Sequence, residues 1–184
     1  RCESEEVFRQ TAALVNGFKA YYARNGQPVC ENPSPGNKAG GITTLEEKSL
    51  GCTQKGGLSP VRDVLAYAAP VRKSGLSLVW GPGNDLCAVT ALAGAGAQII
   101  LFTTGRGTPF GSPVPTVKVS TNSTLAAKKP HWIDFDAGRL LTGDTMTDLT
   151  DKLRSLVLRT ANGEETRAEL AGDRGIALFK SGVT

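Results

Sequence analysis

The sequence predicts an α/β fold, a Rossmann-like three-layer domain with a mainly parallel sheet. After Gly75, short apolar segments of strand length alternate with helical segments. Alternating strands and helices are typical of a parallel sheet that helices cover on both faces. The segments between them are rich in Gly, Thr, Asn and Asp, as in Gly81–Asp85, Thr103–Gly111 and Ser120–Asn122. In such folds ligands bind beyond the carboxyl ends of the strands, so these loops are the first place to look for chemistry.

The chain is expected to be one domain, with helices and a Pro/Gly-rich loop over residues 1–58 and a βα core over residues 59–184. A helix is predicted over Ser4–Arg24, because apolar residues recur at three- to four-residue spacing and acids fill the first turn. Gly26 and Pro28 are expected to end this helix.

Proline and glycine are frequent in the next segment. Asn32–Gly41 holds too many Pro and Gly residues for a helix or a central strand, and we expect an ordered loop or a linker. Thr43 and Thr44 each stand three residues before a Glu, the capping-box pattern, which predicts a helix to about Gln54. A further short helix is predicted from Ser59 through Tyr67.

The remaining expected elements form the βα core. In chain order they are a strand Leu76–Trp80, a helix Leu86–Ala95, a strand Gln98–Thr103, a strand Thr116–Ser120, a helix from the Asn122 cap to Lys128, a strand Trp132–Phe135, a helix of roughly fifteen residues after Thr145, and a strand Ile176–Phe179.

Composition argues against several classes of protein. The net charge of +4 comes from scattered Lys and Arg, so no basic stripe for nucleic acid is present. No apolar stretch approaches the roughly 20 residues of a membrane span. Glu3, Glu5 and Glu6 stand where a signal peptide would be apolar. Because the chain starts at Arg1 and its single methionine is Met146, we expect a fragment of a longer protein.

The cysteine pattern favours a reduced protein in the cytoplasm. No C-x-x-C pair exists among Cys2, Cys30, Cys52 and Cys87. Cys52 and Cys87 could each bind a metal, but burial as a small apolar side chain is the favoured interpretation for each.

Several other candidate side chains allow both a functional and a structural interpretation. His131 is the single histidine, and a structural role at the start of a strand is favoured over a catalytic role. One histidine cannot form a histidine-rich metal site within this chain. Asp134 and Asp136 could bind a hard divalent ion through oxygen, or simply form a turn at a strand end. The P-loop, dinucleotide-binding and nucleophile-elbow motifs are all absent.

Arg106 is the strongest single indication of a ligand. It lies between Gly105 and Gly107, with Thr104 and Thr108 outside them. Glycine lets the backbone approach a ligand closely, and a guanidinium donates paired hydrogen bonds to a carboxylate or phosphate. The alternative is that these loops are only turns.

Several long segments together resemble the altronate/galactarate dehydratase family. They are Asn32–Cys52, Pro82–Asp85, Leu101–Gly111, Thr121–Ser123, His131–Asp134 and Phe179–Thr184. The resemblance covers essentially the whole chain and is to the C-terminal part of longer family members. Ala39, the Thr43–Glu46 run and the Phe179–Thr184 ending look more like altronate dehydratases than galactarate dehydratases.

The resemblance implies a hydro-lyase that converts altronate, or a related aldonic or aldaric acid, to a 2-keto-3-deoxy acid. It also implies a divalent metal, Fe²⁺ or Mn²⁺, with its main ligands in the missing N-terminal and middle regions. The isolated fragment is then expected to be inactive. Expected partners are the small sugar-acid substrate and those missing regions, with no nucleic acid or membrane, and a homodimer is one assembly compatible with this sequence.

The reaction suggests roles for the loop residues. Removing a proton next to a carboxylate needs a base and a stabiliser for the enediolate, for which a divalent ion is one Lewis acid. Residue type and loop position favour Lys38 and Arg106 for charge stabilisation, and Asp85 for a metal or proton-transfer role. Side chains that could hold substrate hydroxyls are Asn37, Asn84, Thr104, Thr108 and Asn122.

Two alternatives to an enzyme remain. One is a non-catalytic, Rossmann-like module that binds an anionic ligand, and the other is a structural half that supports another domain.

Overall fold

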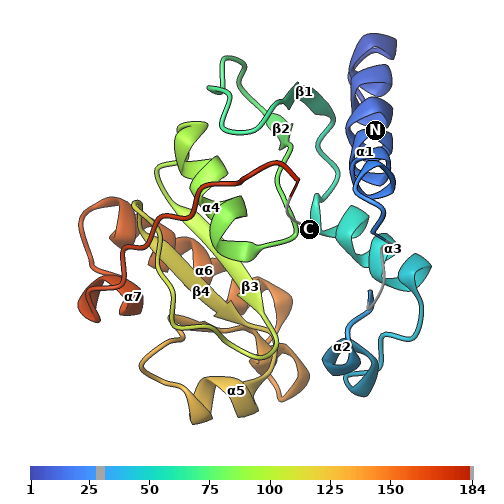
Figure 1. Ribbon diagram of the computed structural model, residues 1–184. Helices are drawn as coiled ribbons and strands as arrows, with labels where there is room; N and C mark the ends of the chain where they lie inside the picture. Colours follow the sequence, from blue (N-terminus) through green and yellow to red (C-terminus); the bar gives the residue numbers. More distant parts are fainter. Residues whose placement is uncertain (28–31, 183–184) are drawn as a thin grey trace. The chain divides into compact units, whose positions relative to one another are not determined.

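The computed structural model describes residues 1–27 and 32–182 (Figure 1). The predicted helix stop at Pro28, the thiol of Cys30 and the end of the family-like Phe179–Thr184 motif lie outside these residues. The chain forms two compact units. Unit 1 is Arg1–Ala66, Val71–Trp80 and the segment from Lys180 on, and unit 2 is Tyr67–Pro70 and Gly81–Phe179.

Unit 1 begins with the predicted amphipathic helix. Its elements are α1 (Glu5–Arg24), α2 (Pro35–Ala39), α3 (Leu45–Lys55), β1 (Val61–Leu65) and β2 (Leu76–Val79). The N-cap of α1 is Ser4, whose side chain accepts the backbone N–H of Val7, and Glu5 and Glu6 lie in the positive first turn. Thr44 caps α3 as predicted, accepting the N–H of Glu47. The capping signals in the sequence therefore located both helices correctly.

Two predictions in unit 1 were wrong. The Pro/Gly-rich segment contains a short helix, α2, because Ser34 caps it with Asn37 and Pro35 occupies a first-turn position that needs no N–H donor. The predicted helix Ser59–Tyr67 is strand β1. Its partners are distant in sequence, so local signals could not identify it: β1 pairs in parallel with β2, and Cys2 bridges to Val61.

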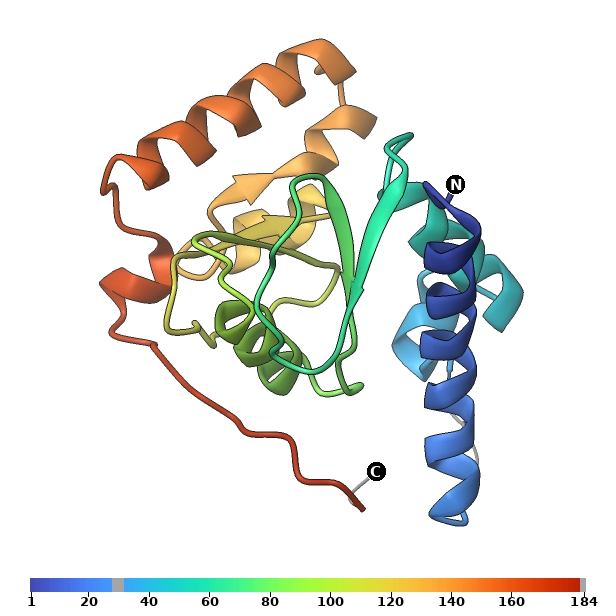
Figure 2. The ribbon, with the colours of Figure 1, turned by 90° about the horizontal axis from the view of Figure 1, so that it is seen from above.

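Helix α1 packs beside strand β1 in unit 1, as Figure 2 shows. Tyr21, buried on α1, meets the ring of Trp80 edge-on at 6.5 Å between centroids. The backbone N–H of Gly182 donates to the Tyr21 hydroxyl at 3.0 Å, so the end of the described chain returns to this unit.

Unit 2 is a three-layer α/β unit built on a parallel sheet of order β3-β4-β5. Figures 1 and 2 place α4 on one face of this sheet and α6 on the other. The predicted fold class is thus confirmed. The elements are α4 (Asp85–Gly94), β3 (Ile100–Thr104), β4 (Thr116–Ser120), α5 (Ser123–Lys128), β5 (Phe135–Asp136), a 3-10 helix (Ala137–Leu141), α6 (Met146–Ala161) and α7 (Arg167–Leu170).

Strand β4 lies between its two neighbours and is buried along its whole length. Val117 is completely inaccessible to solvent, and Val119 and Leu125 join it in the core. A strand that is buried along its whole length is typical of a parallel sheet covered on both faces, although only Val117 and Val119 of its five residues are apolar.

The last predicted strand, Ile176–Phe179, was also wrong. The segment is extended, but its backbone donors bond to side chains instead of a neighbouring strand. The N–H of Ala177 donates to Thr90 Oγ1 at 3.2 Å, and that of Phe179 donates to the Tyr67 hydroxyl at 3.2 Å.

Strand β5 is shorter than predicted, because the N–H groups of Trp132 and Ile133 both bond to the Lys129 carbonyl in a turn. The four-residue helix α7 was not predicted. Across residues 1–27 and 32–182, no helix is both long and apolar enough to cross a membrane.

Candidate functional site

The loops that follow β3 and β4 lie side by side at the carboxyl edge of the unit 2 sheet. The N–H of Thr121 donates to the Thr104 carbonyl at 3.0 Å. The side-chain amide of Asn122 donates to the Gly105 carbonyl at 3.1 Å. The structure therefore brings together the loops that carry Thr104, Arg106 and Asn122, at the edge where parallel sheets bind ligands.

The loop after β3 is anchored at alternate backbone positions. Between these anchors, the side chain of Arg106 is exposed and makes no hydrogen bond or ion pair with any residue that the structure describes. A fixed backbone with a free guanidinium is an arrangement suited to an anion. The anchors are Asn122 Nδ2 to Gly105 O (3.1 Å), Gly107 N to Thr104 Oγ1 (2.9 Å), Lys118 Nζ to Pro109 O (2.8 Å) and Gly175 N to Gly111 O (3.0 Å).

Gly107 and Gly138 are two of the positions in this edge that require glycine. Gly107 has φ +80°, and a Cβ there would lie 3.0 Å from a Leu125 methyl group. At Gly138, after β5, a Cβ would lie 2.5 Å from Asn122 Cα and 2.3 Å from the backbone N of Ser123. The segment after β5 therefore contacts the loop after β4 so closely that any side chain at residue 138 would collide with the backbone of Asn122 and Ser123.

The predicted site residue Asn122 has a clear local role. Its Oδ1 accepts the N–H of Leu125 at 2.8 Å as the N-cap of α5, and its Nδ2 bonds to Gly105. One amide hydrogen is left over for a ligand. Thr104 accepts the N–H of Gly107, so its hydroxyl proton stays available, and Thr108 is half-buried in the same loop.

Asn84 and Asp85 begin helix α4, also in unit 2. Asn84 is the N-cap and accepts the N–H of Cys87 at 3.1 Å. Asp85 is exposed in the first turn, where the helix dipole favours a carboxylate. Within the described residues, neither side chain forms a hydrogen bond with the loops after β3 and β4.

Asn37 and Lys38 belong to α2 in unit 1. The Asn37 Oδ1 accepts from Ser34 Oγ at 3.1 Å and from Lys48 Nζ at 3.2 Å, so it helps to hold the α2 cap. Lys38 is exposed at the other end of this helix.

Sequence reasoning missed the buried lysine Lys118. It lies in the middle of β4 with 0% of its surface exposed, and its Nζ donates to the Pro109 carbonyl. Burial lowers the pKa of Lys118, while the charges of Asp134 and Asp173 act in the opposite direction. The available signal was a lysine between two valines, Val117 and Val119, in a strand predicted to be covered on both faces.

Asp134 and Asp136 have structural partners. The two Asp134 oxygens accept the backbone N–H groups of Lys118 and Arg167, both at 2.7 Å. Burial raises the pKa of Asp134, and these two hydrogen bonds partly offset the effect. Asp136 accepts the N–H of Gly138 at 2.9 Å, which favours the strand-end turn of the two interpretations.

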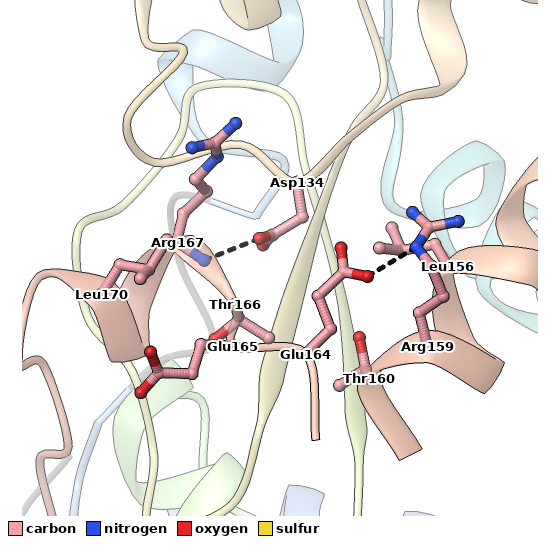
Figure 3. A pocket seen from close by; sticks show the side chains of 9 residues that line it. All are labelled: Asp134, Leu156, Arg159, Thr160, Glu164, Glu165, Thr166, Arg167 and Leu170. Atoms are coloured by element: carbon pink, nitrogen blue, oxygen red, sulfur yellow. Dashed lines mark hydrogen bonds and ion pairs between the residues drawn. The ribbon is translucent and has the colours of Figure 1, made fainter. Parts of the chain in front are cut away.

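A separate cavity of about 430 Å³ lies beside Asp134 (Figure 3). Asp134 directly precedes β5, whereas the candidate loops follow their strands, so this cavity belongs to the entry side of β5. Acidic and basic groups are mixed in its lining, and Arg159 is already paired with Glu164 at 2.6 Å. This mixture selects no ligand class. The lining residues are Asp134, Leu156, Arg159, Thr160, Glu164, Glu165, Thr166, Arg167 and Leu170.

The described residues do not form a metal site by themselves. No group of three or more His, Cys, Asp or Glu side chains among them is placed to hold an ion. Cys2, Cys52 and Cys87 are free thiols, and His131 is exposed beside Trp132 with 5.4 Å between ring centroids. Of the predicted site residues, Asp85 offers one exposed carboxylate of the kind that binds a divalent ion.

Comparison with known proteins gives the family of the chain. The family described as D-galactarate/altronate dehydratase, C-terminal, matches residues 1–184. The chain belongs to this family. The chain is 56% identical over 183 residues to altronate dehydratase of Escherichia coli (strain K12), and the match covers 100% of the chain.

Other family members are also similar to this chain. Altronate dehydratase of Bacillus subtilis (strain 168) is 55% identical over 187 residues, covering 100% of the chain. Galactarate dehydratase (L-threo-forming) of Escherichia coli is 34% identical over 167 residues, covering 90% of the chain and 32% of that relative. The chain spans 37% of the length of each of the two altronate dehydratases.

Proposed function

We propose that the chain is the C-terminal part of a sugar-acid dehydratase, a hydro-lyase that converts altronate to a 2-keto-3-deoxy acid. The family membership supports a dehydratase, and the stronger similarity to altronate dehydratases than to galactarate dehydratase supports altronate. The partner regions that complete the enzyme are the parts of the relatives that this chain does not match.

The observation that carries the proposal is the anchored loop that presents Arg106 beside Thr104 and Asn122. The Arg106 guanidinium binds the substrate carboxylate through two parallel hydrogen bonds. When the proton next to the carboxylate is removed, negative charge moves onto those oxygens, and a fixed cation stabilises it without reorganising. The Thr104 hydroxyl, the Thr108 hydroxyl and the remaining Asn122 hydrogen bind the sugar hydroxyls.

Further roles fall to the other candidates. Asp85 takes part in proton transfer or adds an oxygen ligand to a metal, and Asn84 binds a substrate hydroxyl through the amide group that its cap leaves free. For Lys38 and Asn37, which belong to unit 1, charge stabilisation and hydroxyl binding stay predictions from the sequence. The full-length protein requires Fe²⁺ or Mn²⁺, with its main ligands outside this chain. It works in the reducing cytoplasm, where its free thiols persist, and a homodimer remains a prediction.

A substrate panel tests the proposal. The full-length protein is assayed under reducing conditions with Fe²⁺ or Mn²⁺ against aldonic and aldaric acids, with detection of the 2-keto-3-deoxy product. We expect the highest kcat/KM with altronate. Binding of sugar acids without turnover of any of them would contradict the proposal and support the anion-binding module.

A further inference from the structure

Lys118 is a buried cation whose ammonium group makes one hydrogen bond to the residues that the structure describes, and that bond goes to a loop. Its side chain is fully inaccessible in the middle of β4, and Nζ donates to the Pro109 carbonyl at 2.8 Å. It forms no ion pair with any carboxylate in residues 1–27 and 32–182, and the oxygens of the nearby Asp134 are occupied by backbone N–H groups. Burying an ammonium group without a directly paired carboxylate is costly even with the charges of Asp134 and Asp173 nearby, so an apolar residue would be expected here.

The hydrogen bond to Pro109 suggests why a lysine occupies this buried position. Proline has no N–H, so its backbone can form hydrogen bonds only through its carbonyl group. The other anchors of the loop act at Gly105, Gly107 and Gly111. Without Lys118, no hydrogen bond seen among the described residues would hold the backbone between Gly107 and Gly111, and only the packing of the Phe110 ring on Phe102, 5.1 Å between centroids, would remain there.

We propose that Lys118 is a positioning residue, which holds the Pro109 carbonyl and thereby fixes the loop that presents Arg106. Lys118 itself does not touch the substrate, because it is fully buried. Its effect on the reaction rests on the proposed function of Arg106, whereas its effect on the loop does not.

Native-state proteolysis tests the loop directly. Trypsin can cut after Arg106 in the open loop, whereas cutting after Lys152, within helix α6, requires that helix to unfold. In the full-length enzyme, Lys118→Met removes the anchor and keeps an apolar side chain of similar length. Losing a hydrogen bond from a charged donor should raise the ratio of cleavage after Arg106 to cleavage after Lys152 by about tenfold or more.

A matched control separates anchoring from stability. Val117→Ala also trims an inaccessible β4 side chain, but on the other face of the strand, so it should lower the melting temperature and leave the cleavage ratio unchanged. Lys118→Gln keeps a neutral donor and should give an intermediate ratio, and it replaces Lys118→Met if that variant does not fold.

Kinetics provide the second readout. With the loop released, kcat/KM should fall mainly through a higher KM, while Val117→Ala should retain its KM. An unchanged cleavage ratio in Lys118→Met would overturn the inference. A raised ratio with unchanged kinetics would support the anchor and overturn instead the role proposed for the Arg106 loop in the reaction.

Discussion

Arg106 and Lys118 are two cations in opposite surroundings, one exposed and one buried, joined through the same loop. The exposed guanidinium has no partner among the described residues, and the buried ammonium bonds to the loop backbone. Binding and positioning are thus divided between two side chains. A hydrated surface cation can reach a ligand, whereas a buried one can hold a backbone in place.

Replacing Arg106 with Lys tests the role of the guanidinium. The substitution keeps the charge but loses the paired donors that match a carboxylate. In the full-length enzyme we expect kcat/KM to fall by about 10- to 150-fold, the equivalent of a lost charge-assisted hydrogen bond of about 1.5–3 kcal/mol. The melting temperature should not change. Arg154→Lys, at an exposed position on α6, is the control and should have normal kinetics.

The outcome discriminates between a substrate role and a structural role for Arg106. If Arg106 only holds its own loop, activity and melting temperature should fall together. Unchanged kinetics, or a loss that unfolding fully explains, would exclude the substrate role and leave Lys38 as the main candidate.

At the scale of elements, close packing of loops determines the geometry of the sheet edge. Replacing Gly138 with Ala would place Cβ within 2.5 Å of the Asn122 backbone, which cannot move without disturbing the α5 cap. We expect this substitution to lower the free energy of unfolding by about 1–3 kcal/mol, as overpacking does. Chemical denaturation measures the change.

Gly17→Ala is the matched control for this substitution. Gly17 lies within α1, and a Cβ there would meet nothing within 4 Å. Alanine is a better helix former, so the free energy of unfolding should rise by about 0.5–1 kcal/mol. A stable Gly138→Ala variant, comparable to Gly17→Ala, would show that the loops can separate without cost.

The start of α6 should respond to acid. Hydrogen bonds from the Thr145 hydroxyl and then the Thr145 backbone N–H lower the pKa of Asp148 below its usual 3.8. The carboxylate is therefore favoured in the folded state, and its stabilisation is present above pH 3.8 and lost as pH falls through the lowered pKa. Asp148→Asn should be less stable than the wild type at neutral pH, and the difference should vanish in acid. A difference that persists unchanged at the lowest pH would contradict this assignment.

At the scale of the whole molecule, the proposed residues are distributed over both units. Asn37 and Lys38 belong to unit 1, and Asp85, Arg106 and Asn122 to unit 2. The described residues also contain no group placed to bind a metal ion. Under the proposed function, the catalytic centre also requires residues from the regions of the altronate dehydratases that this chain does not match.

This requirement predicts the behaviour of the isolated chain. The 184-residue polypeptide should fold, as judged by circular dichroism and a cooperative melting transition, yet should not dehydrate altronate with Fe²⁺, Mn²⁺ or any other divalent ion. The full-length protein at the same concentration is the positive control. Measurable turnover by the isolated chain would show that its own residues suffice for the reaction.

Local signals in the sequence determined much of this protein. Capping residues located α1, α3, α5 and α6, because an N-cap bonds to backbone only two or three residues away. Alternating apolar segments predicted the parallel sheet, and loop composition indicated the edge where Thr104, Arg106 and Asn122 meet. Each of these signals lies within a short stretch of the sequence.

Tertiary structure decided what depends on distant partners. Val61–Leu65 becomes a strand because β2 and the chain around Cys2 lie beside it. Ile176–Phe179 is not a strand, and the N–H groups of Ala177 and Phe179 bond to the side chains of Thr90 and Tyr67. The anchor from Lys118 to Pro109 joins a strand to the preceding loop through the core, and no spacing rule indicates it. Hydrogen bonds of this kind form only after packing excludes water, so the folded chain, and not its local sequence, selects them.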